Sequence, residues 1–147
     1  MICRITLGDW ETQREAAQPV RHEVFVVEQK VPLDMEWDEM DKVCVHAVAF
    51  DEGGAAVGTG RLLPDGHIGR MAVREAARGK GIGAAMLNAL VAEAEKRGDR
   101  AVMLNAQIQA EPFYARFGFV RDGEEFMEAG IPHIHMHRLL ACKTGRS

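Results

Sequence analysis

The stretch Gly69–Leu90, GRMAVREAARGKGIGAAMLNAL, decides how the rest of the chain is interpreted. It predicts a short strand over Ile68–Val73, a polar loop, a glycine-rich turn over 78–83 and a helix that opens at the last glycine. Glycines accept backbone conformations that other residues resist, and a helix start carries unpaired N–H groups and a positive dipole end. The turn is therefore expected to bind an anion, most simply a phosphate or pyrophosphate.

Three phosphate-binding patterns compete for this turn, and two of them fit poorly. The nucleoside-triphosphate loop needs Ser or Thr after its Gly-Lys pair, but Lys80 is followed by Gly81. The dinucleotide fingerprint needs a carboxylate at the end of the next strand, and the strand expected over 101–105 has none. Arg78, Gly81 and Gly83 match the third pattern, Arg/Gln-x-x-Gly-x-Gly/Ala, without adjustment. The turn thereby resembles the acetyl-coenzyme A pyrophosphate loop of the GNAT superfamily of N-acetyltransferases.

The bulk composition limits the class of protein. The chain has 147 residues, 47% hydrophobic and 27% charged, which is typical of one globular domain. Its net charge of −4 and its lack of a basic cluster argue against a nucleic-acid partner. With no apolar run of membrane-spanning length and no signal-peptide pattern, we expect no membrane partner and a cytoplasmic location. The widely spaced Cys3, Cys44 and Cys142 suit reduced thiols better than a disulfide framework.

Hydrophobic periodicity and turn residues predict the remaining elements. Asp9 is the expected N-cap of a helix that begins at Trp10 and is interrupted by Pro19. The segment over 28–41 is acidic, and we expect a solvated loop whose carboxylates together attract a cationic amine. The other expected helices cover 20–28, 83–97 and 109–117, and the other expected strands cover 1–7, 44–50, 55–63, 101–105, 119–126 and 133–140, with a loop over 127–132.

This order of elements is similar to that of the GNAT superfamily, and two further motifs support the resemblance. Glu111–Phe119, EPFYARFGF, resembles the superfamily's helix with a tyrosine just before a Gly-Phe corner. Arg21–Gln29, RHEVFVVEQ, and Gly130–His133, GIPH, resemble the ElaA-like branch of acyltransferases. The resemblance implies one α/β (α+β) domain over 1–141 and a flexible tail over 142–147. It implies a mixed, mostly antiparallel sheet of about seven strands, about four flanking helices, and parallel strands splayed around the cofactor.

The resemblance also implies how the acyl donor, acetyl-coenzyme A, is bound. Backbone N–H groups of the glycine turn would hold the pyrophosphate, and the main chain of Met71 and Val73 would bind the pantetheine arm and polarise the thioester. No metal is expected. The expected cofactor-binding residues are Met71, Ala72, Val73, Arg78, Gly79, Lys80, Gly81, Ile82, Gly83, Ala84, Asn105, Phe113 and Tyr114.

The implied reaction moves an acetyl group to a primary amine of a small molecule or peptide, directly within a ternary complex. Tyr114, the one tyrosine of the chain, lies where the family places its general acid. Because an alkylamine is mostly protonated at pH 7, a base must take a proton before attack, and Glu28, Glu36 and His133 are the candidates. Asn105 is expected to orient the substrate or a water molecule, with packing or a turn hydrogen bond as an equal alternative.

Two alternatives stay open at this level. A non-catalytic acyl-coenzyme A sensor would keep the glycine turn without the proton chemistry, and Cys44 with His46 on one strand face would suit a thiol acyl-enzyme. His133, His135 and His137 alternate along the last strand and share one face, which we interpret as an outward face and not a metal site. The sequence leaves the oligomeric state open, and a homodimer is compatible with it.

Overall fold

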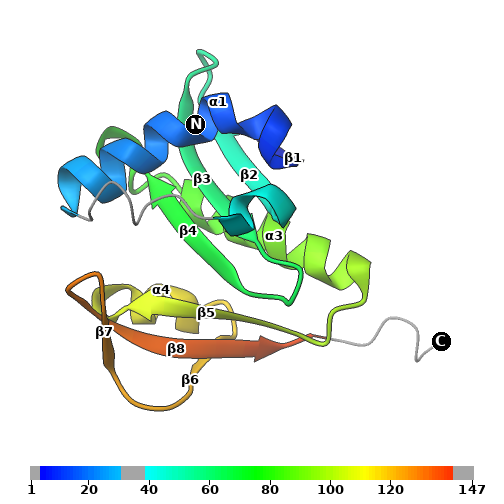
Figure 1. Ribbon diagram of the computed structural model, residues 1–147, viewed down its shortest axis with the longest axis vertical. Coiled ribbons are helices and arrows are strands. Elements are labelled where there is room, and N and C mark those ends of the chain that lie inside the picture. The colour runs from blue at the N-terminus through cyan, green and yellow to red at the C-terminus, as the bar shows by residue number, and fades with distance from the viewer. Residues whose placement is uncertain (1–3, 31–38, 141–147) are drawn as a thin grey trace.

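The computed structural model describes residues 4–30 and 39–140 of the chain. These residues form two four-stranded sheets with helices packed around them, and α1 and α3 cover opposite faces of the first sheet (Figure 1). The strands are β1 (Arg4–Gly8), β2 (Val45–Phe50), β3 (Ala56–Leu62), β4 (Ile68–Val73), β5 (Ala101–Gln107), β6 (Val120–Arg121), β7 (Phe126–Glu128) and β8 (Ile131–Leu139). The helices are α1 (Trp10–Arg21), α3 (Ile82–Arg97) and α4 (Glu111–Ala115), with a π-helix η1 (His22–Glu28) and 3-10 turns η2 (Glu39–Val43), η3 (Glu75–Ala77) and η4 (Ile108–Ala110).

The two sheets meet where β4 and β5 diverge. The first sheet has the antiparallel order β1-β2-β3-β4, and the second has the order β5-β8-β6 with β7 also paired to β8. Among the described residues, a single parallel bridge, between His67 and Met103, joins the sheets before β4 and β5 separate. The expected mixed sheet with splayed parallel strands is therefore confirmed. Within the described part of the chain it has eight strands, because the strand expected over 119–126 is divided into β6 and β7.

The main core lies between α3 and the two sheets. Met86, Leu87 and Leu90 of α3 are fully buried, and burial of each such side chain stabilises the fold by about 1.5–3 kcal/mol. They pack against apolar residues of both sheets, including Leu104 and Ile134. The predicted stripe on α3 is thus confirmed, and the helix ends at the left-handed Gly98 as its sequence predicts.

The first helix confirms one prediction and corrects another. Asp9 is its N-cap, because the carboxylate accepts a hydrogen bond from the Thr12 backbone N–H at 3.0 Å. The predicted interruption at Pro19 is wrong, since α1 continues through Pro19 to Arg21 and leads directly into η1. The buried positions Ala17 and Val20 keep helical spacing across Pro19, so burial of this face outweighs the one backbone hydrogen bond that proline removes.

The end of the acidic segment is also not the solvated loop that its charge predicts. Asp41 is fully buried and accepts hydrogen bonds from Arg21 at 2.9 and 3.1 Å and from Arg61 at 2.8 Å. His46 Nε2 donates to the Asp41 carbonyl oxygen at 2.9 Å. Burial raises the pKa of the Asp41 carboxyl, but the two guanidinium groups outweigh it and hold that pKa below its usual value. This cluster fixes η2 against the first sheet.

The hairpin near the C-terminus is tighter than expected. The loop expected over 127–132 is a two-residue turn, because Met127 pairs with Pro132 and Glu128 pairs with Ile131 across β7 and β8. Ala129 and the glycine after it have φ angles of 52° and 77°, the left-handed conformations that such turns require. The described helices include none that is long and apolar enough to cross a membrane.

Candidate active site

A bulge in β4 marks the point at which the two sheets separate. Thr59 of β3 pairs with Ala72 and Arg61 pairs with Gly69, so β4 has one extra residue opposite Gly60. Arg70 lies in this bulge with a φ of 51°, which is a strained conformation for a side chain of its size. The bulge bends β4 away from β5 and directs its residues into the opening.

The glycine turn and the start of α3 form an anion-binding cradle at one end of this opening. Gly81, the N-cap of α3, has a φ of 80°, and the first hydrogen bond inside the helix runs from the Ala85 N–H to the Gly81 carbonyl at 3.0 Å. The N–H groups of Ile82, Gly83 and Ala84 precede that bond, so they have no acceptor within the helix. A positive dipole end and several N–H donors in one place suit a diphosphate.

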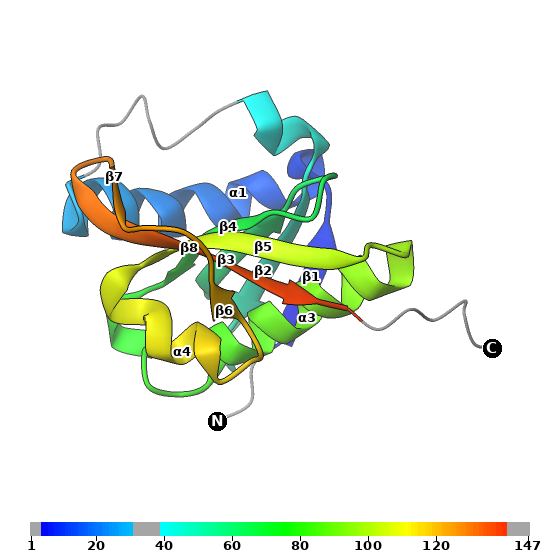
Figure 2. The ribbon, with the colours of Figure 1, turned by 90° about the horizontal axis from the view of Figure 1, so that it is seen from below.

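The cradle opens into a cavity of about 360 Å³. Figure 2 shows the glycine turn, in green, beside α4, which supplies Phe113 and Arg116 to the same cavity. A Cβ added at Gly83 would lie 3.6 Å from the Phe113 ring, whereas one at Gly79 or Gly81 would meet nothing within 4 Å. The cavity is thus shaped by the missing side chain at Gly83, and its residues fit a coenzyme A diphosphate.

The predicted cofactor residues are not all directed into this cavity. Lys80 is exposed, and Arg78 is turned toward η1, where it forms two hydrogen bonds with Glu28 at 2.6 and 2.7 Å and one with the Val73 carbonyl at 2.9 Å. The hydrogen bond from Arg78 lowers the pKa of the Glu28 carboxyl, and the Glu28 carboxylate raises the pKa of Arg78. Arg116 is the basic side chain that lines the cavity alongside Arg78.

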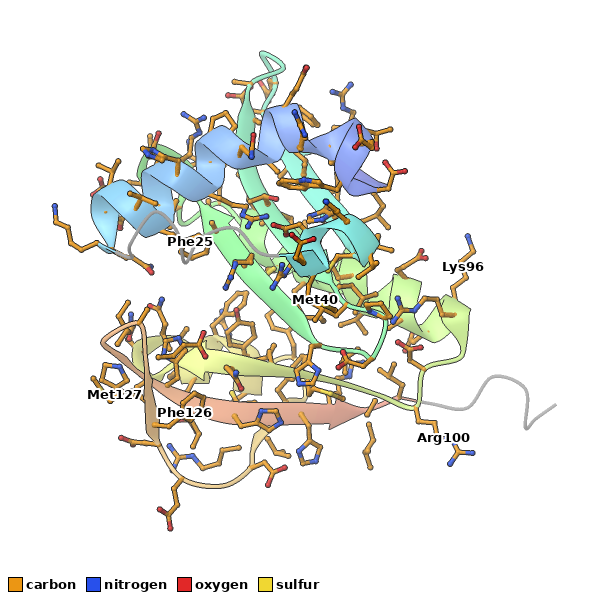
Figure 3. The ribbon with its side chains drawn as sticks, in the orientation of Figure 1. Phe25, Met40, Lys96, Arg100, Phe126 and Met127 are labelled. Carbon is orange, nitrogen blue, oxygen red and sulfur yellow. The ribbon has the colours of Figure 1, made fainter. Side chains whose placement is uncertain are left out.

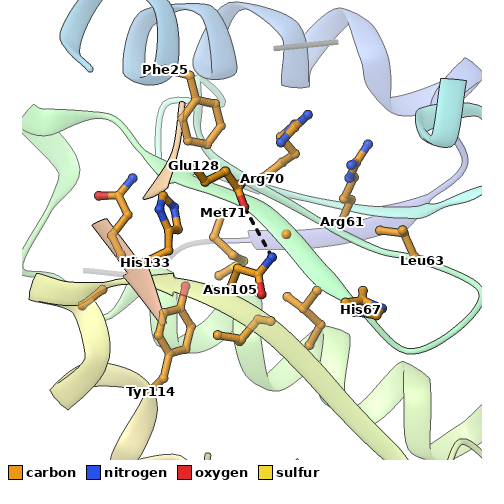
Figure 4. A pocket seen from close by; sticks show the side chains of 15 residues that line it. Phe25, Arg61, Leu63, His67, Arg70, Met71, Asn105, Tyr114, Glu128 and His133 are labelled. Carbon is orange, nitrogen blue, oxygen red and sulfur yellow. Dashed lines mark hydrogen bonds between the residues drawn. The ribbon is translucent and has the colours of Figure 1, made fainter. Parts of the chain in front are cut away.

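A second cavity, of about 310 Å³, lies at the other side of the opening (Figure 4). Phe25 reaches it from η1 (Figure 3), and the β4 bulge and the β7–β8 hairpin form two of its walls. Tyr114 and His133 both line it, so the structure brings these two predicted residues together. The full lining is Phe25, Arg61, Leu63, His67, Ile68, Gly69, Arg70, Met71, Leu104, Asn105, Gln107, Ala110, Tyr114, Glu128 and His133.

Tyr114 lines the second cavity and is the next residue along α4 after Phe113, which lines the cradle cavity. Its ring packs edge-on against Phe113 at 5.0 Å and against Phe119 at 6.0 Å between centroids, while its hydroxyl points into the second cavity (Figure 4). Burial raises the pKa of Tyr114 to about 12, because the phenolate would lose its hydration. The group therefore remains a proton donor at any physiological pH.

His133 begins the row of alternating histidines on β8. The core-facing side of that strand carries Ile134 and Met136, both buried as predicted. His133 itself is 7% exposed, and its ring stacks on Phe126 at 5.9 Å between centroids. Its Nδ1 lies 2.7 Å from the Ile131 carbonyl oxygen, which can only accept, so Nδ1 carries the proton. In the neutral ring, Nε2 is then left with a lone pair.

Asn105 is hydrogen-bonded on both sides. Its Oδ1 lies 2.8 Å from His135 Nδ1, and its Nδ2 donates to Glu128 Oε1 at 3.4 Å. Glu28 does not reach this cavity, because it is held by Arg78, and Glu36 lies outside the described residues. Of the predicted base candidates with a described position, only His133 shares the cavity with Tyr114.

Comparison with known proteins agrees with this geometry. A family model described as "Acetyltransferase (GNAT) domain" matches residues 11–140. The chain belongs to this family. It is 42% identical over 130 residues to the Bacillus subtilis (strain 168) protein named "Uncharacterized N-acetyltransferase YjcF", covering 86% of this chain and 92% of that relative.

Two crystal structures superpose on this GNAT domain over most of its length. An acyl-CoA N-acyltransferase from Pseudomonas aeruginosa superposes with a TM-score of 0.83 at 35% identity, and Escherichia coli ElaA superposes with a TM-score of 0.83 at 29% identity. Each comparison covers 93% of this chain and 99% of the other. The resemblance to the GNAT superfamily and to ElaA is therefore confirmed.

Several residues that line the cavities of the GNAT domain were not predicted, and Arg116 and Glu128 are two of them. Arg116 belongs to the motif at 111–119, and its spacing of three residues from Phe113 could have placed both on one face of the helix, beside the expected cofactor site. Glu128 gave no signal, because it lay in an expected loop next to several other carboxylates. Only the tight hairpin turn brings it to the cavity.

The described residues contain no group of three or more His, Cys, Asp or Glu side chains placed to hold a metal ion.

Proposed function

We propose that this domain transfers the acetyl group of acetyl-coenzyme A to a primary amine of a small molecule or peptide, directly within a ternary complex. The observation that supports it best is the arrangement of two adjacent residues on α4. Phe113 lines the cradle cavity and Tyr114, the next residue of α4, lines the second cavity, so this helix borders both spaces. A thioester that extends from the cradle along β4 would reach the Tyr114 hydroxyl.

The edge of β4 that faces the opening is suited to hold such a donor. Arg74 N–H bonds to β3, so in an antiparallel ladder the backbone groups of Val73 point to the other side, while Met71 lies in the bulge, outside the regular ladder. The Val73 carbonyl follows this rule, because it accepts from Arg78 and not from β3. These backbone groups would bind the pantetheine amides and, through an N–H, polarise the thioester carbonyl.

The donor supplies an activated acetyl group, and the residues of the chain manage the protons. His133 Nε2 takes a proton from the bound ammonium group, which leaves a neutral amine whose lone pair forms the new C–N bond. As the C–S bond breaks, Tyr114 donates a hydrogen bond to the departing sulfur. The second proton lost by the nitrogen ends on the thiol, His133 releases the first proton to solvent, and Tyr114 finishes the cycle protonated.

The alternatives receive less support. Cys44 is buried with its Sγ 3.0 Å from the Met40 carbonyl, and it lines neither of the two cavities. His46 is engaged by the Asp41 carbonyl, and burial lowers its pKa. A thiol acyl-enzyme therefore lacks access to the donor. A sensor would not need Tyr114 and His133 together in a second cavity. A cytoplasmic location agrees with a coenzyme A donor.

The proposal is tested by incubating the purified protein with acetyl-coenzyme A and a panel of primary amines, and measuring thiol release and the acetylated product. We expect release that depends on the amine and that is unchanged by Cys44→Ser. Binding of acetyl-coenzyme A without release in any amine would favour a sensor. Loss of release in Cys44→Ser, with the melting temperature unchanged, would favour the acyl-enzyme.

A further inference from the structure

The tip of the β7–β8 hairpin places a carboxylate, that of Glu128, at the second cavity. Glu128 is the last residue of β7, and its pairing with Ile131 closes the two-residue turn. Ala129 adopts a φ of 52°, a left-handed conformation that glycine or asparagine would adopt with less strain. A turn this short fixes the backbone of Glu128, and the side chain itself is exposed. In Figure 4 its carboxylate points toward Asn105, into the space that the Tyr114 hydroxyl also faces.

A chain of hydrogen bonds orients this carboxylate. His135 Nδ1 lies 2.8 Å from Asn105 Oδ1, which directs the amide nitrogen of Asn105 toward Glu128 Oε1 at 3.4 Å. The three side chains come from β8, β5 and β7, so neighbouring strands of the second sheet hold them together. The imidazole donates to the amide oxygen, the amide nitrogen donates to the carboxylate, and the carboxylate oxygens can accept further hydrogen bonds from a ligand.

The charges around the cavity differ from wall to wall. Arg61 and Arg70 lie on the wall formed by β3 and β4, where Arg61 is held by the buried Asp41 at 2.8 Å. Glu128 is the one carboxylate among the described residues that line the cavity, and it lies on the opposite wall with His133. A cationic group is therefore attracted to the wall formed by β7 and β8, next to the proposed base.

We infer that Glu128 binds the ammonium form of the acceptor, so that the enzyme selects primary alkylamines that are cationic in solution and presents them to His133. This assignment rests on the proposed function. Asn105 and His135 are positioning residues that aim the carboxylate. The ammonium group would lie between Glu128, His133 and Tyr114, and it passes its proton to His133 once the thioester is in place.

The test compares two ligands that differ only in charge. For an alkylamine that the wild-type protein acetylates, the alcohol with the same carbon skeleton is measured as a competitive inhibitor. We expect Glu128→Gln to raise KM for the amine about tenfold to 100-fold, the range for loss of a hydrogen bond to a charged group, and to leave the inhibition constant of the alcohol unchanged. Glu128→Asp should recover part of the loss. Glu124→Gln is the matched control, because it removes the same charge from the exposed β6–β7 connection.

Each outcome decides the assignment. A selective effect on the amine in Glu128→Gln, with KM unchanged in Glu124→Gln, supports it. Equal weakening of amine and alcohol, or no weakening of either, overturns it while the acetyltransferase proposal stands. If the wild-type protein acetylates no amine, the proposed function fails first and this assignment fails with it. Melting temperatures measured for all variants separate a loss of recognition from a loss of folding.

Discussion

Replacing Tyr114 by phenylalanine removes one oxygen atom from the lining of the second cavity. The phenyl ring keeps its edge-on contacts with Phe113 and Phe119, which carry the packing of this side chain. The hydroxyl points into the cavity and has no hydrogen-bond partner among the described residues. We therefore expect Tyr114→Phe to fold normally and to bind acetyl-coenzyme A as the wild-type protein does.

The effect on turnover should be large. Loss of a positioned proton donor costs about 10²- to 10⁴-fold in rate, or about 2.7 to 5.4 kcal/mol in the activation barrier. The pKa of about 12 decides how Tyr114 acts. A thiol, with a pKa near 8.5, is the stronger acid, so in the proposed reaction Tyr114 would stabilise the leaving sulfur by a hydrogen bond and would not remain ionised. The contribution of Tyr114 to turnover should be present at all pH values below about 12 and be lost only as the pH rises through that value.

The assay is steady-state thiol release across pH 6 to 10, together with calorimetric binding of coenzyme A. We expect the variant to show a lower kcat at every pH and an unchanged dissociation constant. A kcat within about threefold of the wild-type value would refute the assignment of Tyr114 as the donor. An activity loss in the wild-type protein centred near pH 9, traced to the ionisation of this tyrosine, would refute the account of its environment.

Three further substitutions test other parts of the structure. Gly83→Val directs a branched side chain toward Phe113, and calorimetry should show coenzyme A binding weakened at least about tenfold with little change in melting temperature. Asp41→Asn leaves two buried guanidinium groups without their carboxylate, so denaturant unfolding should show a loss of about 3–5 kcal/mol; because the folded pKa of Asp41 is lowered, its contribution in the wild-type protein should be complete above about pH 4 and disappear at lower pH. Glu28→Gln frees Arg78 from an exposed ion pair, so stability should change by less than about 1 kcal/mol; an unchanged kcat would exclude Glu28 as the base.

The fold follows from short-range patterns in the sequence. The glycine turn before α3, the buried stripe on that helix and the alternation along β8 are all set by residues close together in the chain, so periodicity predicts them. Pro19 predicts a helix break because it removes a backbone hydrogen bond. The break does not occur because Ala17 and Val20, on either side of Pro19, are buried, and that burial arises only in the packed structure. The divided strand over 119–126 was missed for a related reason, since both pieces depend on pairing with β8.

Only those site residues that belong to a local sequence motif were predictable. Tyr114 and the glycine turn belong to local patterns, and the structure places both at the opening between the sheets. The partners of charged side chains are set by distant parts of the chain. Arg78 meets Glu28 across fifty positions, and Asp41 becomes a buried partner of Arg61 and not a surface carboxylate. No spacing rule predicts such pairs, because side-chain contacts of this kind arise from the complete fold.

The single bridge between His67 and Met103 has a consequence for the life of the protein in the cell. The two halves of the sheet lack a continuous ladder of backbone hydrogen bonds, and a peptide-like pantetheine arm lying along β4 would serve as a substitute strand. The free energy of unfolding would then be about 2.7 kcal/mol higher with ligand than without it, when the ligand concentration is a hundred times the dissociation constant. The resistance of the chain to unfolding and proteolysis would then rise and fall with the acyl-coenzyme A supply.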